Sequence, residues 1–228
     1  MQIIPVIDLR SGVVVRAQAG QRKDYRPIQS LLAKTCDPIE IVQGFFTLGS
    51  FDTLYIADLD AIMQSGDNRT VIARISEVFP KLRLWVDPGL RHAKDFVDWR
   101  LALNIDLVLG SESLHDPFDL NALDKGQDYI LSLDFLGSDF LGPMHILTQA
   151  HLWPHRLIVM TLKNIGLSAG PDWRRLEKIL ASAGDRSVYA AGGVRGEEDL
   201  RTLKAMGAAG VLVASALHQK KLSFNTVR

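Results

Sequence analysis

The stretch Ala190-Ala191-Gly192-Gly193-Val194-Arg195 decides the fold, because it has a counterpart half a chain earlier. That counterpart is Val86-Asp87-Pro88-Gly89-Leu90-Arg91. The two stretches stay in register, without a gap, through the helix-like segments that follow them to residues 107–111 and 211–215. A period of half the chain indicates two related halves rather than a solenoid of short repeats.

Eight short apolar runs recur along the chain, and each is followed by a turn and a helix-like stretch. They are mostly continuous, which is typical of strands buried on both faces of a parallel sheet. Eight such units in 228 residues, with no linker or low-complexity segment, predict one (β/α)8 barrel domain over residues 1–228. An open doubly wound sheet is the alternative. The runs span residues 3–7, 53–57, 82–86, 106–109, 129–133, 157–161, 188–191 and 211–214.

Helix starts can be read between several of these runs. Asp37 is followed by a proline and then by Glu40, which predicts a capped helix start. Asn68 and Asp172 stand where they can cap the next helices. A helix over 197–206 should end at Gly207, since glycine favours the position after a helix.

Charge and composition exclude several classes of protein. The 26 basic and 26 acidic residues balance, which argues against a nucleic-acid or anionic-membrane partner. The single cysteine, Cys36, cannot form an internal disulfide, which favours a reducing compartment. No leader and no apolar run of about 18 residues is found, so we expect a cytoplasmic protein without a transmembrane helix.

A phosphate site is predicted at the ends of the last two strands. Gly192 and Gly193 let backbone N–H groups approach an anion. Ala214 and Ser215 follow the eighth run, and Ser215 can open a short helix over 215–221 whose first N–H groups favour phosphate. In (β/α)8 barrels the loops after strands seven and eight are a frequent phosphate site. Tight turns alone are the alternative.

The internal repeat predicts a second phosphate site across the barrel mouth, formed by Gly89, Arg91, Gly110 and Ser111. It differs from the first because Asp87-Pro88 precedes Gly89, and proline has no N–H to offer. Arg91 can compensate for the negative charge of the aspartate.

Aspartates end several of the predicted strands. A looser match within the repeat pairs Ile7-Asp8 with Leu133-Asp134, so Asp8 and Asp134 should face one pocket from opposite sides. Two such carboxyl groups can act as base and acid if their environments separate their pKa values. Asp58 is expected to face the mouth and contact substrate, while Asp60 caps the next turn.

Other chemistries lack a motif. The six histidines are scattered, and Pro154 separates His151 from His155, which argues against zinc. No P-loop, dinucleotide fingerprint or nucleophile elbow is present. We therefore expect no zinc site and no nucleotide site of these kinds.

The chain resembles the barrel family of histidine biosynthesis, which comprises the phosphoribosylformimino-AICAR ribotide isomerase and the cyclase subunit of imidazole glycerol phosphate synthase. The resemblance rests on Ile3-Ile4-Pro5-Val6-Ile7-Asp8-Leu9, Tyr55-Ile56-Ala57-Asp58-Leu59-Asp60-Ala61, Gly192-Gly193-Val194 and Val213-Ala214-Ser215-Ala216-Leu217. It implies a barrel of two half-barrels, a substrate with a phosphate at each end, and neither a metal nor an organic cofactor. It also implies that Asp8 is the general base of an Amadori rearrangement, that Asp134 is the general acid, and that Thr161 contacts the substrate.

The chain departs from the isomerase pattern at several points. No acid follows Thr161, the loop over 135–142 lacks the arginine and tryptophan that hold the imidazole, and Asp87-Pro88 replaces a glycine pair. Only residues 224–228 stand where a closing helix belongs, so we expect a shortened last helix and a monomer or homodimer. We expect an isomerase-like enzyme for a phosphorylated sugar-like substrate. The alternatives are a paralogue with another phosphorylated substrate in a cofactor pathway and a non-catalytic phosphate-binding barrel.

Overall fold

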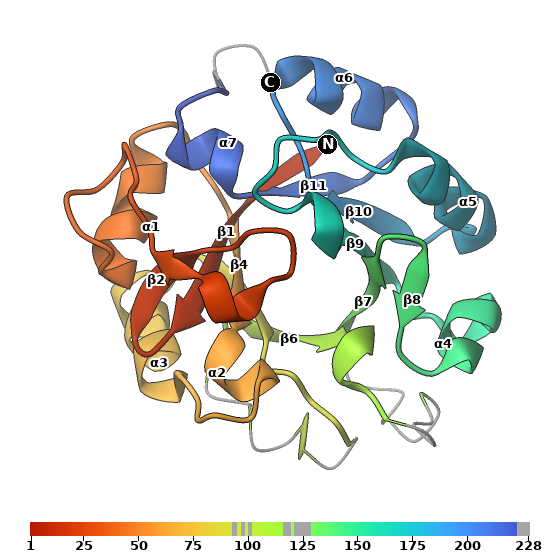
Figure 1. Ribbon diagram of the computed structural model, residues 1–228, viewed down its shortest axis with the longest axis horizontal. Helices are drawn as coiled ribbons and strands as arrows, with labels where there is room; N and C mark the ends of the chain where they lie inside the picture. The colour runs from red at the N-terminus through yellow and green to blue at the C-terminus, as the bar shows by residue number, and fades with distance from the viewer. Residues whose placement is uncertain (93–94, 97–98, 100–101, 116–119, 121–128, 223–228) are drawn as a thin grey trace.

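Eight parallel strands close into a barrel, which confirms the predicted (β/α)8 fold. The computed structural model describes the whole chain except residues 93–94, 97–98, 100–101, 116–119, 121–128 and 223–228. The strands pair in chain order, and the first pairs with the last, Gln2 lying opposite Gly210. Figure 1 looks along this barrel. Its strands are β1 (Gln2–Arg10), β4 (Thr53–Asp58), β5 (Arg83–Asp87), β6 (Ile105–Gly110), β7 (Tyr129–Leu136), β9 (Arg156–Thr161), β10 (Ser187–Ala191) and β11 (Gly210–Val213).

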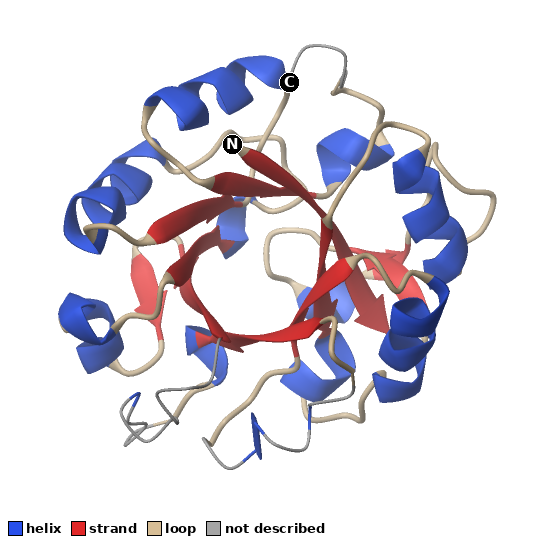
Figure 2. Cartoon of the chain, turned by 180° about the vertical axis from the view of Figure 1, so that it is seen from behind, coloured by secondary structure: helices blue, strands red, loops and turns tan. Residues whose placement is uncertain are grey.

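Helices form an outer ring around the strands, as Figure 2 shows from behind. The α-helices are α1 (Pro38–Phe46), α2 (Leu59–Ile62), α3 (Arg69–Val78), α4 (Met144–Thr148), α5 (Trp173–Ala183), α6 (Glu197–Ala205) and α7 (Ser215–His218). The predicted helices after β5 and β6, and the segment 224–228, include residues outside the described part of the chain. No helix among the described residues is long and apolar enough to cross a bilayer.

Short elements that the apolar pattern does not predict decorate the strand ends. The antiparallel strands β2 (Val13–Arg16), β3 (Arg26–Pro27) and β8 (Asp139–Leu141) extend β1 and β7. Single 3-10 turns lie beside them and elsewhere: η1 (Arg22–Asp24), η3 (Ser111–Ser113), η5 (Ala150–Leu152) and η6 (Leu162–Asn164). Two of these turns, η1 and η3, bring charged side chains to the functional cavity described below.

Two of the predicted helix caps are confirmed, and the third is wrong. The Asp37 carboxylate accepts the N–H groups of α1, and Asp172 accepts the N–H of Arg175 at 3.1 Å in α5. Asn68 precedes α3, but its side chain makes no cap hydrogen bond. The side-chain oxygen that would cap the helix accepts the N–H of Gly12 at 2.9 Å instead, and the amide nitrogen donates to Asp58 and Asp60, two buried carboxylates that need donors.

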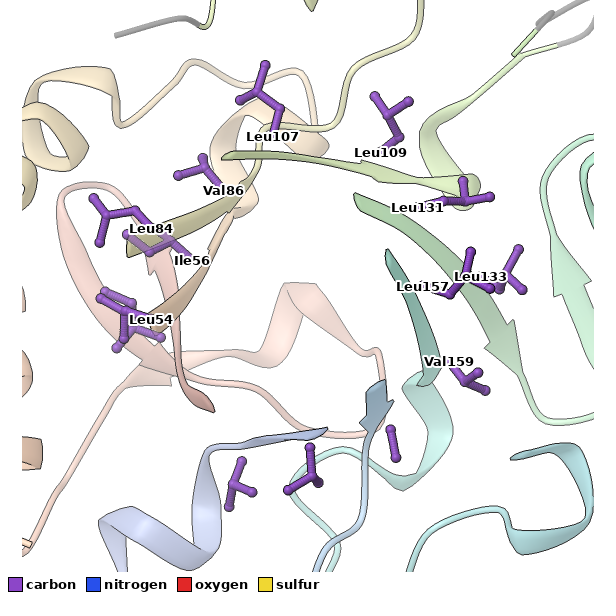
Figure 3. Close-up of a cluster of buried hydrophobic side chains, with 14 of the residues drawn as sticks. Leu54, Ile56, Leu84, Val86, Leu107, Leu109, Leu131, Leu133, Leu157 and Val159 are labelled. Atoms are coloured by element: carbon purple, nitrogen blue, oxygen red, sulfur yellow. The ribbon is translucent and has the colours of Figure 1, made fainter. Parts of the chain in front are cut away.

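Both faces of the strands are buried, which explains why the apolar runs are continuous. The outward face packs against the helices through residues such as Leu54, Ile56, Leu84 and Val86 (Figure 3). The inward face fills the barrel, where the rings of Trp85 and Tyr189 meet edge to face with centroids 4.8 Å apart. The interior is therefore a packed core and not a pore.

The amino-terminal end of the barrel carries an ion-pair cluster around the buried carboxylate of Asp106. Asp106 binds Arg83, and it binds Arg156 at 2.7 Å, each residue lying at the start of its strand. Burial raises the pKa of Asp106, but the hydrogen bonds from both arginines outweigh it and hold the pKa below its ordinary value. This end of the barrel serves stability, which leaves the opposite end for function.

Candidate active site

A cavity of about 850 Å3, including open solvent at its mouth, lies at the carboxyl ends of the strands. Its wall contains residues from the ends of β5, β10 and β11, together with Asp8 near the end of β1. This is the position at which (β/α)8 barrels bind their substrates.

One end of the cavity is formed by the predicted phosphate loops. Gly192, Gly193, Ala214 and Ser215 all line it. Gly193 has φ +86°, and a Cβ at this residue would lie 2.3 Å from the carbonyl oxygen of Gly170, so only glycine fits. The N–H groups of Gly193, Ala214 and Ser215 donate to no other described residue. Three unpaired donors at the edge of a cavity are the chemistry that an anion needs.

Asp8 lies in this cavity without a fixed partner. Val6 and Asp8 follow Ile4 along the inward face of β1, which carries the carboxyl group to the cavity wall. No described residue donates a hydrogen bond to the Asp8 carboxylate. Burial raises its pKa to about 7, and the positive charge of Arg22 offsets part of that rise. A carboxyl group with this pKa can take up and release a proton near neutral pH.

Asp134 reaches the same cavity from β7, but it is firmly held. Its oxygens accept the Ser132 hydroxyl at 2.6 Å and the Glu112 N–H at 3.1 Å. Burial raises its pKa well above the ordinary value, and the charges of Glu112 and Asp87 raise it further. Burial therefore favours the protonated form of both carboxyl groups, and at Asp134 the neighbouring acids favour it further.

A third aspartate, Asp87, joins them at the end of β5. It is 4% exposed, and it accepts the Tyr55 hydroxyl at 3.3 Å and the Gly89 N–H at 3.0 Å. Burial raises its pKa to about 7, although the hydrogen bond from Gly89 lowers it. Tyr55 lies among the three aspartates: burial raises the pKa of Tyr55, and the charges of Asp87, Asp134 and Asp8 raise it further. From the sequence, Asp87 was expected only to place a negative charge near the second predicted phosphate site.

Two further charged residues of the cavity wall were not predicted. Arg22 and Glu112, from the turns η1 and η3, form an ion pair with each other and line the cavity. Glu112 directly follows the predicted residues Gly110 and Ser111, so its place at a strand end was a usable signal. Arg22 lies in a loop that carries no periodic pattern, and nothing in the sequence marked it.

The residues predicted for a second phosphate site do not line the cavity. The N–H of Gly89 binds Asp87, and the Ser111 hydroxyl lies 3.4 Å from Asp134 Oδ2. Gly110 leaves room for two carboxylates, because a Cβ there would lie 2.8 Å from Asp87 Oδ2 and 3.2 Å from Asp134 Oδ2. Arg91 points instead to His115 and to the carbonyl oxygen of Ile62.

Asp58 and Thr161 also lie outside the cavity wall. Asp58 accepts the N–H of Ala61 at 3.2 Å and the N–H of Asn68 at 2.7 Å, so it caps α2, the role that the sequence gave to Asp60. Thr161 ends β9 as predicted, but it is 4% exposed, and its neighbours Met160 and Leu162 form the wall instead. Contact of either residue with a substrate stays a prediction.

The chain is similar to known proteins along nearly its whole length. The family model "Histidine biosynthesis protein" matches residues 2–223. An uncharacterised protein of Methanocaldococcus jannaschii is 31% identical, with 100% of this chain and 97% of the relative covered. Phosphoribosyl isomerase A of Streptomyces coelicolor is 26% identical, with coverages of 96% and 94%.

An Archaeoglobus fulgidus relative is 28% identical over 98% of this chain and 94% of its own length. It is named as an imidazole-4-carboxamide isomerase, and that name contains two 5-phosphoribosyl groups. The family model covers nearly the whole barrel, including every residue of the cavity wall. The chain therefore belongs to the histidine biosynthesis protein family.

Proposed function

We propose that the protein is a cofactor-independent isomerase that converts a phosphorylated aldose derivative into the corresponding ketose derivative. This proposal is carried by one observation: the Asp8 carboxylate and the N–H groups of Gly193, Ala214 and Ser215 lie in the same cavity, and none of them has a hydrogen-bond partner among the described residues. The N–H groups bind the substrate phosphate and thereby place the sugar carbons next to the base. The names of the relatives as isomerases support the same class of reaction.

The two aspartates divide the proton transfers of an Amadori-type rearrangement between them. Asp134 donates its proton to the ring oxygen as the bond between C1 and that oxygen breaks, and the nitrogen on C1 forms an iminium. Asp8 then removes the proton from C2, which gives an enolamine. Return of a proton to C1 and loss of the hydroxyl proton at C2 complete the ketone. The raised pKa values suit both roles, because an acid must hold its proton and a base must be strong enough to accept one.

The test is turnover by the wild-type protein and by Asp8→Asn with a panel of aldose phosphates and phosphorylated aldosylamines. The panel includes the substrate that names the Archaeoglobus relative. Loss of a general base should lower turnover by about 10²-fold or more. Equal turnover by both proteins would contradict the proposal. Asp185→Asn, at an exposed aspartate, is the control for the substitution itself.

A non-catalytic phosphate-binding barrel is the second candidate. It is favoured by the apolar Leu162 in the cavity wall directly after Thr161, where the sequence of the isomerase branch leads us to expect an acid nearby. Under this alternative, the panel binds to the protein but none of its members is converted.

A further inference from the structure

The two related halves of the barrel have placed opposite kinds of residue at the two ends of the cavity. The repeat aligns Asp87 with Ala191 and Glu112 with Ala216. The end that has alanines at these positions contains the N–H groups that donate to no other described residue. The end that has acids there presents their carboxylates to the cavity. The difference between the ends therefore lies in two matched pairs of residues.

Two N–H groups of the acidic end already donate to carboxylates of the protein. Gly89, the counterpart of Gly193, donates to Asp87 Oδ1 at 3.0 Å. The N–H of Glu112 donates to Asp134 Oδ2 at 3.1 Å. Pro88, the counterpart of Gly192, has no N–H at all. The protein's own carboxylates thus occupy two donors of this end, and Pro88 removes a third.

The charge of this end also opposes a second phosphate. Asp87, Glu112 and Asp134 line the wall, and Arg22 is the one positively charged side chain among the described residues that do. Arg22 already forms an ion pair with Glu112. A phosphate at this end would be repelled by these acids when they are ionised, or would require them to stay protonated. The described acids also do not form a group that could hold a metal ion. The structure therefore gives no reason to expect that a bound metal neutralises the negative charge of this wall.

We propose that the substrate carries a single phosphate, bound by the loops at 192–193 and 214–215, and ends opposite it in a hydrogen-bond donor, an amine or a hydroxyl, held by Asp87 and Glu112. This proposal rests on the proposed function for the position of the phosphate. It separates this chain from the Archaeoglobus relative, whose substrate name contains two 5-phosphoribosyl groups.

The experiment measures binding by calorimetry with three matched series of straight-chain alkyl monophosphates of increasing length. The second end of the chain carries an ammonium, a hydroxyl or another phosphate. We expect the ammonium and hydroxyl series to bind, with one length best, and the bisphosphate of that length to bind at least about tenfold more weakly. Equal or tighter binding of the bisphosphates would overturn the inference.

Two variants locate the effect and keep it apart from the proposed function. Asp87→Ala with Pro88→Gly gives the acidic loop the residue types of its counterpart. We expect it to raise bisphosphate affinity by about tenfold and to leave propyl phosphate binding unchanged. Ser215→Asp should abolish binding of every series, because it places a carboxylate at the phosphate loops.

The outcomes are distinguishable. If Ser215→Asp leaves binding unchanged, or no monophosphate binds the wild-type protein, the phosphate position is wrong and both proposals fail. If Ser215→Asp abolishes binding but the double variant does not favour bisphosphates, the proposed function stands and the single-phosphate inference fails.

Discussion

The N–H of Gly89 donates a 3.0 Å hydrogen bond to the carboxylate of Asp87, two residues earlier in the same loop. In the matching loop of the other half-barrel, Gly193 lines the cavity, and its N–H has no acceptor among the described residues. The Gly89 N–H is therefore paired within its own loop, whereas the Gly193 N–H remains available to a ligand. The predictions below test what each end of the cavity does.

Asp8→Asn should lower turnover by about 10²-fold or more, because an amide cannot accept the C2 proton. Binding of propyl phosphate should be unchanged, since the phosphate loops are not altered. In the wild-type protein, kcat should rise with pH through about 7, as Asp8 loses its proton. Steady-state rates between pH 5 and 9 check this, and a flat profile would contradict the role of Asp8.

Ser215→Asp should weaken the binding of propyl phosphate at least about tenfold, because a carboxylate repels the phosphate at the start of α7. Ser215→Ala is the matched control: it keeps the backbone N–H and should bind nearly as well as the wild type. Calorimetric titration of both variants measures the difference. Equal affinities in the two variants would place the phosphate elsewhere.

Gly110→Ala should disturb the acids without touching the phosphate loops. Its Cβ would lie 2.8 Å from Asp87 Oδ2 and 3.2 Å from Asp134 Oδ2, so at least one carboxyl group must move. Overpacking of this kind costs about 1–3 kcal/mol of unfolding free energy. We expect that loss in urea denaturation together with reduced turnover. Gly196→Ala is the control, because a Cβ at Gly196 meets no atom within 4 Å.

Asp87→Asn should make the protein less sensitive to rising pH. The pKa of Asp87 is about 7 in the folded protein against 3.8 as its ordinary value, so the folded state binds the proton more tightly. Stability is therefore lost as pH rises from about 4 to about 7. The Tm of Asp87→Asn relative to wild type should increase over this range and then level off. A constant difference from pH 4 to 8 would show that the pKa of Asp87 is not raised.

The barrel could be predicted from the sequence because its strands are buried on both faces, which makes each one a continuous apolar run. The same continuity hides which face each residue takes. Asp58 and Asp87 both end strands, but Tyr55 and Ala57 point inward on β4, which turns Asp58 away from the cavity, whereas Trp85 points inward on β5 and brings Asp87 into it. Only the strand register, which determines the face that each residue takes, distinguishes Asp87 from Asp58.

The alternation of strand faces that turns Asp58 away from the cavity brings the predicted acid and base, Asp134 and Asp8, into it. Asp8 and Asp134 each follow inward-pointing residues at intervals of two, such as Ile4 on β1 and Ile130 on β7. Arg22 has no such pattern, because it reaches the cavity from a loop whose path depends on the tertiary structure. The second phosphate site was expected from the repeat, but its predicted residues lie outside the cavity wall, and the N–H of Gly89 donates to Asp87.

The unequal loops after β5 and β10 also determine the direction in which a ligand can lie. A barrel of two equivalent halves, with identical loops, would accept a molecule with two similar ends in either orientation, and only one of those orientations would bring the reacting carbon to Asp8. With amide donors at one end and carboxylates at the other, a reversed ligand meets repulsion at both ends. Under the proposed function, this asymmetry favours the one orientation that brings the reacting carbon to Asp8.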